Sequence, residues 1–364
     1  MLLAILVGVL FVGYGTAYVA SEDVRFLTRA GFEENRILRA RRPIDRVIAD
    51  PGTDPDLRAA LGLVLEVRDY ADSVGLAAKE TYTTYADVER DTLLLVLSAS
   101  PKDCLCPYTW RYPIVGRVPY KGFFDFDMAH RSAADLAARG FDTSLRPSAA
   151  FSTLGWFNDP LLSTAVSPDS VELAALVFHE ITHNTVYVPG AAPFNEGLAQ
   201  MVGYLTAAQF FEERGDSLLA QRARGRWQDE VALSAYYDRL TDKLDSLYGR
   251  EPPPDSIALE VGRTRVGEWA GEFLADSVGP RLSTYRVESR EPRPINNARI
   301  IARRIYRTKL NLFDAWYMAN GWDVRQTMGA LEPVLDGVTG AGGGGGGGDS
   351  AYVALERALS AIKD

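Results

Sequence analysis

Two histidines one helical turn apart are the feature that most constrains how this chain folds. They lie in the segment Val-Phe-His-Glu-Ile-Thr-His at positions 177–183, where four residues separate His179 from His183. On a helix this spacing gives about 400° of rotation and about 6 Å of rise, so both imidazoles project from one face and can bind one ion. Glu180 lies about 100° around the helix from His179. That position suits a general base that takes a proton from metal-bound water, rather than a ligand.

His-Glu-x-x-His also arises by chance in unrelated helices, and a second segment makes it more specific here. Phe-Asn-Glu-Gly-Leu-Ala at positions 194–199 follows a turn at 189–190. A second helix that folds back over the first would place Glu196 opposite both imidazoles. Two neutral imidazoles and one carboxylate leave a fourth position open for water, as in catalytic zinc sites. Two of the chain's three histidines lie in this motif. The sequence therefore predicts Zn2+ held by His179, His183 and Glu196.

The periodicity of apolar residues predicts an α+β chain that is mostly helical, with a small mixed β-sheet beside the histidine-bearing helix. We expect one large domain at 22–336, in which 22–90 and 214–336 are helical and 91–213 holds the sheet and both metal-binding helices. Strands are expected at 92–98, 112–115, 121–126 and 149–154, and the main helices at 171–185, 195–213, 217–247, 261–276 and 297–316. A glycine run at 342–348 predicts a linker within 337–364, followed by a short terminal helix.

The first 21 residues are typical of a membrane segment. No charged side chain precedes Glu22, and about twenty apolar residues are enough to cross a bilayer as a helix. A cleaved signal peptide and a buried core helix are the alternatives. Because no basic stretch precedes the apolar run, we favour an uncleaved anchor. Arg25 and Arg29 follow the span, and taken alone they would keep the rest of the chain in the cytoplasm.

Charge and cysteine content exclude several other classes of protein. The net charge of −9 argues against non-specific binding to nucleic acid and to anionic membrane surfaces, both of which favour an excess of Lys and Arg. Cys104 and Cys106 are the only cysteines, so no disulfide framework is expected. We interpret them as two small, semi-buried, unpaired residues, because nothing nearby completes a four-ligand metal site. A disulfide between them is the alternative, although the single intervening residue would strain it.

The two metal-binding segments resemble those of the gluzincins, a class of zinc peptidases. More closely, the chain resembles a bacterial family described as putative or predicted aminopeptidases, over about residues 42–316. The segments that carry the resemblance are Tyr82–Asp87, Tyr112–Gly116, Val118–Asp125, Phe151–Pro160, Val177–His183 and Phe194–Glu196. The resemblance implies a zincin-like fold and a zinc peptidase that acts on peptide substrates. It also implies a catalytic body at the inner membrane, in the periplasm or outside.

The chain departs from the gluzincin pattern at two positions near the glutamate ligand. Four residues after Glu196, where an acid often orients the first histidine, the chain has Gln200. The amide oxygen of Gln200 can still accept a hydrogen bond, although it adds no charge. A further acid, often found one turn beyond, is replaced by Gly203. Both departures predict weaker support for the metal ligands.

A tyrosine is expected to complete the catalytic group. The resemblance implies a hydrogen-bond donor for the oxyanion from the C-terminal helical part, in addition to the metal. Tyr306 is the first candidate, and Tyr187 and Tyr236 are the next. Packing of Tyr306 in a helical core is the alternative interpretation.

Residues 152–159 correspond to the sheet-edge strand that pairs with the substrate backbone in gluzincins. Gly155 would permit close approach of that backbone, and Trp156 would line a side-chain pocket. Asp159 would pair with the substrate α-amine, which an aminopeptidase must recognise. Alternatively, Asn-Asp-Pro at 158–160 is an ordinary turn.

Three functions remain open from the sequence. The first is a zinc aminopeptidase that acts on short peptides, and the second is a membrane-tethered zinc endopeptidase with an open cleft. The third is a catalytically silent binding module with the same fold. The carboxylate of Glu180 argues against the third, since a silent site has no need for a base beside its metal.

Overall fold

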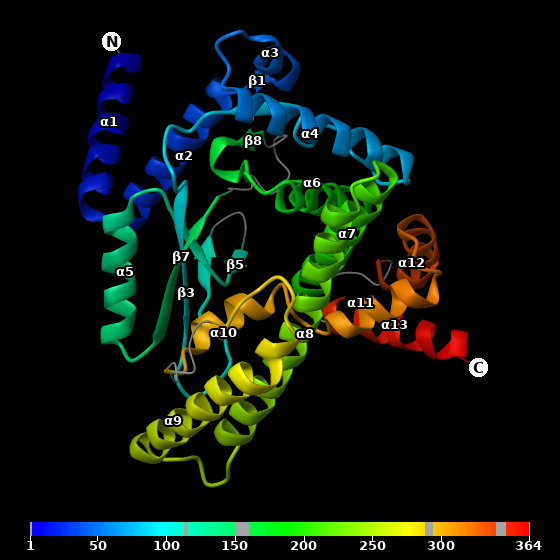
Figure 1. Cartoon of the computed structure of the whole chain (residues 1–364). Coiled ribbons are helices and arrows are strands. Elements are labelled where there is room, and N and C mark those ends of the chain that lie inside the picture. The colour runs from blue at the N-terminus through cyan, green and yellow to red at the C-terminus, as the bar shows by residue number, and fades with distance from the viewer. Residues whose placement is uncertain (1, 113–115, 150–159, 288–293, 340–346, 364) are drawn as a thin grey trace.

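The described part of the chain is mostly helical with three small sheets, which confirms the α+β prediction (Figure 1). This computed structural model describes residues 2–112, 116–149, 160–287, 294–339 and 347–363. The helices are α1 Leu2–Ala20, α2 Glu22–Ala40, α3 Ile44–Ala49, α4 Pro55–Ser73, α5 Phe126–Ala138, α6 Ser170–Thr185, α7 Ala192–Glu213, α8 Ser217–Tyr248, α9 Ser256–Phe273, α10 Asn297–Arg304, α11 Leu310–Ala319, α12 Val324–Thr339 and α13 Gly347–Lys363. The strands are β1 Arg42–Pro43, β2 Thr84–Ala86, β3 Leu94–Ser100, β4 Trp110–Tyr112, β5 Gly116–Val118, β6 Lys121–Phe123, β7 Asp142–Ser148 and β8 Leu161–Leu162.

An antiparallel sheet of order β6-β3-β7 lies between α5 and α10 (Figure 1). Leu97 and Ala99 of β3 pack with the buried residues of α5 on one face. Val96 therefore faces the other side, because successive side chains alternate along a strand. In the register of the sheet, Val96 lies opposite Arg146 of β7. Arg146 consequently lies on the face that α10 covers.

The sheet prediction is partly confirmed. A three-stranded mixed sheet of order β1-β2-β8 does form, with β2 and β8 parallel, and Tyr85 and Leu161 join it to the core that includes α6. The larger antiparallel sheet was not expected as a separate unit. Its edge strand β7 was missed, while the strand expected at 149–154 falls almost wholly outside the described residues.

The largest core cluster forms around α4, α6 and α7, the last two of which are the most extensively packed pair of helices. Tyr70, Phe178 and Phe210 stack edge to face within it, with ring centroids 5.4–6.3 Å apart. Because Phe178 is buried among these aromatic rings on one side of α6, the rotation of the helix about its axis is set. This packing fixes the orientation of the histidine-bearing helix.

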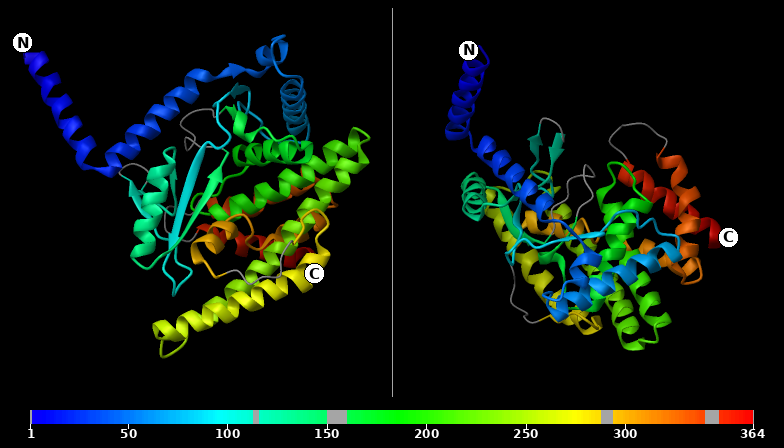
Figure 2. Two further views of the ribbon diagram at one scale, coloured as in Figure 1. Left: turned by 60° about the vertical axis from the view of Figure 1, so that its left-hand side comes forward. Right: turned by 90° about the horizontal axis from the view of Figure 1, so that it is seen from above.

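The predicted membrane segment is corrected by the structure. Residues 2–20 form the helix α1, which contacts α2 and projects from the body (Figure 2). Within the part of the chain that the structure describes, no helix combines the length and apolar character needed to span a bilayer. The predictions of a transmembrane anchor, of a membrane partner and of a membrane-anchored location at the inner membrane are therefore wrong. Apolar content over a short window led to those predictions.

Two further expectations are corrected. The helix expected at 297–316 is two helices, α10 and α11, and Lys309 at the break has a positive φ of 51°. A left-handed residue cannot continue a right-handed helix, and periodicity of apolar residues gives no sign of it. Cys104 and Cys106 are joined by a disulfide, so they are not the unpaired residues expected.

The terminal helix α13 docks on the core. Tyr352 packs against Phe194 and Phe313, with ring centroids 5.3 Å and 6.0 Å away. Lys309 pairs with Glu356 at 2.9 Å. The segment after the glycine run therefore supports α7 and α11.

Candidate metal centre

Helix α6 presents the two histidines because both of its ends are fixed. At its start, the Asp169 carboxylate accepts a hydrogen bond from the Val171 backbone N–H at 3.0 Å, which caps the helix. At its end, the Ala77 backbone N–H donates to Thr185 Oγ1 at 2.9 Å, and the Asn184 amide donates to Thr81. Fixing both ends sets the rotation of the helix about its axis, and with it the direction of the histidine side chains.

Asn195 fixes the loop between α6 and α7. The Val188 backbone N–H donates to Asn195 Oδ1 at 2.9 Å, and Asn195 Nδ2 donates back to the Val188 carbonyl oxygen at 2.8 Å. Asn195 is 3% exposed and Val188 is buried. The Asn195 side chain thus holds the turn closed through two hydrogen bonds with the Val188 backbone. It lies immediately before Glu196 in the chain. The sequence motif had marked this asparagine without giving it a role.

We expect Asn195→Ala to destabilise the protein by about 1–3 kcal/mol, because it leaves the buried N–H of Val188 unpaired, while the Val188 carbonyl keeps its hydrogen bond from the Ala191 N–H at 3.2 Å. Urea unfolding monitored by circular dichroism measures this change. Asn195→Asp is a second variant, which keeps an acceptor for the Val188 N–H but replaces the donor by a buried negative charge facing the Val188 carbonyl oxygen. A loss of less than about 0.5 kcal/mol for Asn195→Ala would contradict the role given to the amide.

The structure brings His179, His183 and Glu196 together. Their ligand atoms all lie within 4.8 Å of one another. The two Nε2 atoms are 3.2 Å apart, and the Glu196 carboxylate lies 3.2 Å from His179 and 3.7 Å from His183. Ligands about 2.0–2.1 Å from a tetrahedral zinc are separated by about 3.3 Å from one another. The three side chains therefore fit one metal ion.

The electrostatics of the three groups favour a positive charge between them. Burial acts to lower the pKa of His179, but the hydrogen bond to Glu196 and the charges of Glu180 and Glu196 raise it overall. Burial together with the neighbouring His179 lowers the pKa of His183. For Glu196, burial raises the pKa, but His179 and His183 outweigh it and lower the pKa overall. A bound cation would replace the proton shared by these groups.

The close packing of α6 against α7 explains why position 203 is a glycine. A Cβ at this position would meet the Ala175 carbonyl oxygen at 2.8 Å and the His179 Cβ at 3.4 Å. Helices α6 and α7 thus approach closely where the gluzincin pattern often has an acid. No side chain larger than hydrogen fits there without moving the backbone of α6 at Ala175, four residues before the first histidine.

Glu180 and Tyr306 lie beside the metal-binding group. The Tyr306 ring is 6.4 Å from the His179 ring, centroid to centroid. Burial raises the pKa of Tyr306 to about 12, and the charges of Glu196 and Glu180 add to this shift while Arg146 opposes it. Tyr306 therefore keeps its proton at neutral pH. It lies in the turn after α10, not within a helix as expected.

The remaining candidates are two tyrosines and the predicted substrate-binding residues. Tyr187 is 62% exposed just beyond α6, and Tyr236 is buried in a separate core cluster with α9. Gly155, Trp156 and Asp159, the predicted substrate-binding residues, fall outside the described residues.

Arg146 and Tyr120 were missed by sequence reasoning. Burial and the charge of Glu196 raise the pKa of Tyr120, and Arg146 acts in the opposite direction. Arg146 also acts on Glu196 and Tyr306. Tyr120 lies within one of the segments that carried the family resemblance, which was its only signal. Arg146 had no signal in the sequence, because its position beside the metal centre depends on the register of β7.

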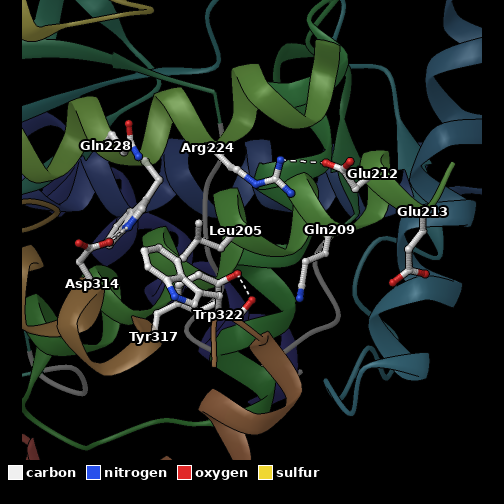
Figure 3. Close-up of a pocket in the computed structure, with 10 residues that line it drawn as sticks. Leu205, Gln209, Glu212, Glu213, Arg224, Gln228, Asp314, Tyr317 and Trp322 are labelled. Atoms are coloured by element: carbon white, nitrogen blue, oxygen red, sulfur yellow. Dashed lines mark hydrogen bonds and ion pairs between the residues drawn. The ribbon is translucent and has the colours of Figure 1, made fainter. Parts of the chain in front are cut away.

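A separate cavity of about 330 Å³ lies at the other end of α7 (Figure 3). It is lined by Gln209, Glu212 and Glu213 of α7, Arg224 and Trp227 of α8, and Tyr317 and Trp322, among others. Glu212 is sixteen residues from Glu196, which is about 24 Å along a helix. The cavity is therefore not part of the metal centre.

Two histidines and a carboxylate at cation-binding spacing, on two packed helices of an α+β fold, are typical of metal-dependent enzymes. The sequence profile of the family described as "Putative aminopeptidase" matches residues 25–336, and the chain belongs to this family. Membership of this family indicates a peptidase that hydrolyses peptide bonds. No curated protein and no solved structure matches the chain.

Proposed function

We propose that the chain is a zinc-dependent aminopeptidase of the gluzincin type, with a zincin-like fold. His179, His183 and Glu196 hold the metal in this proposal. The separation of their ligand atoms, 3.2–3.7 Å, carries the proposal, because it fits tetrahedral zinc with one position left for water or substrate. Family membership supports the aminopeptidase assignment.

In the proposed reaction, a bound zinc ion would supply Lewis acidity, which lowers the pKa of water so that it can lose a proton near neutral pH and attack a peptide carbonyl. Glu180 takes the proton of the attacking water and passes it to the leaving amine. Tyr306 donates its phenolic O–H to the carbonyl oxygen as that oxygen becomes negative. A pKa of about 12 suits this role, since the donor must be protonated.

Substrate orientation is proposed for the region after β7. Gly155 and Trp156 are expected beside the substrate backbone, and Asp159 is expected to bind the free α-amine. Arg146 lies on the face of the sheet that α10 covers, and its charge lowers the pKa of Glu196 and so balances the negative charge of the metal centre. An amine anchor is what separates an aminopeptidase from the alternative, a zinc endopeptidase with an open cleft.

Hydrolysis of amino-acid p-nitroanilides, with zinc measured by elemental analysis, tests this proposal. We expect one zinc per chain, loss of hydrolysis with a chelator, and recovery when zinc is added back. Acetylating the substrate amine should abolish hydrolysis, because the α-amine would lose its charge. Equal hydrolysis of acetylated peptides would favour the endopeptidase instead, and zinc binding without hydrolysis of either substrate would favour a silent binding module.

A further inference from the structure

Tyr306 lies in a short turn whose position is set by helix α8, and this turn is the only link between α10 and α11. Residues 305–309 make up the turn. The turn is held by α8 and is not a free loop. Arg304, Arg307 and the backbone at 307–310 all form hydrogen bonds with residues of α8. These contacts with α8 hold the turn on both sides of Tyr306, and Lys309 and the Thr308 carbonyl add contacts with α13.

The strongest contact joins Arg307 to Glu230. Arg307 Nη2 donates a hydrogen bond to one carboxylate oxygen of Glu230 at 2.8 Å, and Arg307 Nε lies 2.6 Å from the other oxygen as an ion-pair contact, so the two groups meet at two points. The Glu230 side chain is only 1% exposed, and the Tyr285 hydroxyl also donates to it at 2.9 Å. A buried, two-point pair of this kind specifies geometry as well as charge. Arg307 directly follows Tyr306 in the chain.

Two more residues of α8 continue the same face of the helix. Ser234 and Asp238 follow Glu230 at successive intervals of four residues, so all three side chains project in one direction. Ser234 Oγ donates to the Arg307 carbonyl oxygen at 3.0 Å and accepts from the Leu310 N–H at 3.2 Å. Asp238 pairs with Arg304 at 3.3 Å. The backbone is thus held on both sides of Tyr306.

The same face of α8 also holds the histidine-bearing helix. Arg226, four residues before Glu230, lies 2.9 Å from the carboxylate of Glu172 in the first turn of α6. Its guanidinium lies 4.4 Å from the centre of the Tyr285 ring, and Tyr285 in turn bonds to Glu230. Helix α8 therefore connects the element that carries the histidines to the turn that carries Tyr306.

We propose that Glu230 is a positioning residue that acts through Arg307 to hold Tyr306 at hydrogen-bond reach of the reacting carbonyl oxygen. This inference rests on the proposed function. Glu230 touches neither metal nor substrate. Glu230 therefore affects the stability of the transition state, in which the Tyr306 hydroxyl must lie close to the developing oxyanion. It does not affect the affinity for the substrate in the ground state.

A double-mutant cycle in the full-length, zinc-loaded enzyme tests this proposal. Tyr306→Phe should lower kcat by about 10²–10³-fold, as expected for the loss of one oxyanion donor. Glu230→Gln alone should lower kcat by about 10–100-fold, because a displacement of about 1 Å is enough for that loss. In the Tyr306→Phe background, Glu230→Gln should change kcat by less than about twofold, since both changes remove one interaction. KM should stay within about threefold throughout.

Glu33→Gln provides the matched control. Glu33 is also buried, at 1% exposed, and binds Arg29, Arg36 and Arg90 at 2.7–3.2 Å on α2, in the N-terminal part of the chain. It should lower thermal stability and leave kcat unchanged. Should Glu230→Gln fold poorly, Arg307→Lys replaces it, because lysine keeps the charge but cannot form the two-point pair.

Equal losses of kcat from Glu230→Gln in the wild-type and Tyr306→Phe backgrounds would overturn the positioning role. Full activity of Tyr306→Phe would overturn it as well, while leaving the zinc peptidase proposal intact. In contrast, full activity of Glu180→Gln would refute the proposed function itself, so the two failures can be told apart.

Discussion

Replacing Glu180 by glutamine should lower kcat by about 10³-fold, or about 4 kcal/mol of transition-state stabilisation, with zinc still bound. The amide is nearly isosteric with the carboxylate but cannot accept a proton from the attacking water. Because Glu180 projects about 100° away from His179 on α6, its replacement leaves all three ligands in place. Steady-state kinetics on amino-acid p-nitroanilides, together with elemental analysis of the same sample, measures both quantities.

Glu180→Asp is the comparison for that experiment. It keeps the carboxylate but shortens the side chain by one methylene group, so its activity should fall between those of the wild type and Glu180→Gln. Unchanged cleavage by Glu180→Gln would remove the general base from the mechanism. Loss of zinc from Glu180→Gln would instead show that this side chain supports the metal.

The metal-binding group was predictable because it depends on local periodicity. The spacing of His179 and His183 requires only that 177–183 be helical, and the helix α6 forms at Ser170–Thr185, as expected. Glu196 then requires a short reversal, which the turn at 189–190 indicated. The structure adds the reason why the reversal is so well defined, the two hydrogen bonds between Asn195 and Val188.

The surroundings of Tyr306 could not be predicted in the same way. Arg307 and Glu230 are 77 residues apart, and an ion pair at that separation leaves no pattern in one sequence. The break between α10 and α11 falls at Lys309, whose left-handed backbone is rare for lysine and is favoured only by the tertiary fold. A continuous helix over 297–316 fitted the apolar periodicity equally well.

Strand β7 was missed for a similar reason. Its sequence, Asp-Thr-Ser-Leu-Arg-Pro-Ser, is mostly polar and contains Pro147, which are features that argue against a strand. Pairing with β3 along seven residues forms it nevertheless, and proline is tolerated because β7 lies at an edge of the described sheet. Arg146 was missed for the same reason, because only the register of β7 places it toward the metal centre.

Glu196→Ala should weaken zinc binding by more than about 100-fold, because even groups that only support a ligand typically contribute 10–100-fold. It also leaves two partly buried imidazoles 3.2 Å apart without the carboxylate that balances a cation between them. Hydrolysis at limiting zinc should therefore be lost, and excess zinc should restore it only in part. Competition with a chelating dye gives the affinity directly.

Glu213→Gln is the matched control for that loss, since Glu213 lies on the same helix at its other end and bonds only to Tyr70 among the described residues. Its zinc affinity and hydrolysis should equal those of the wild type. Glu180→Gln supplies the complementary comparison, because it should retain zinc and lose hydrolysis, whereas Glu196→Ala should lose both. Wild-type zinc affinity in Glu196→Ala would mean that the carboxylate lies beside the metal without holding it, and the gluzincin assignment would then be wrong.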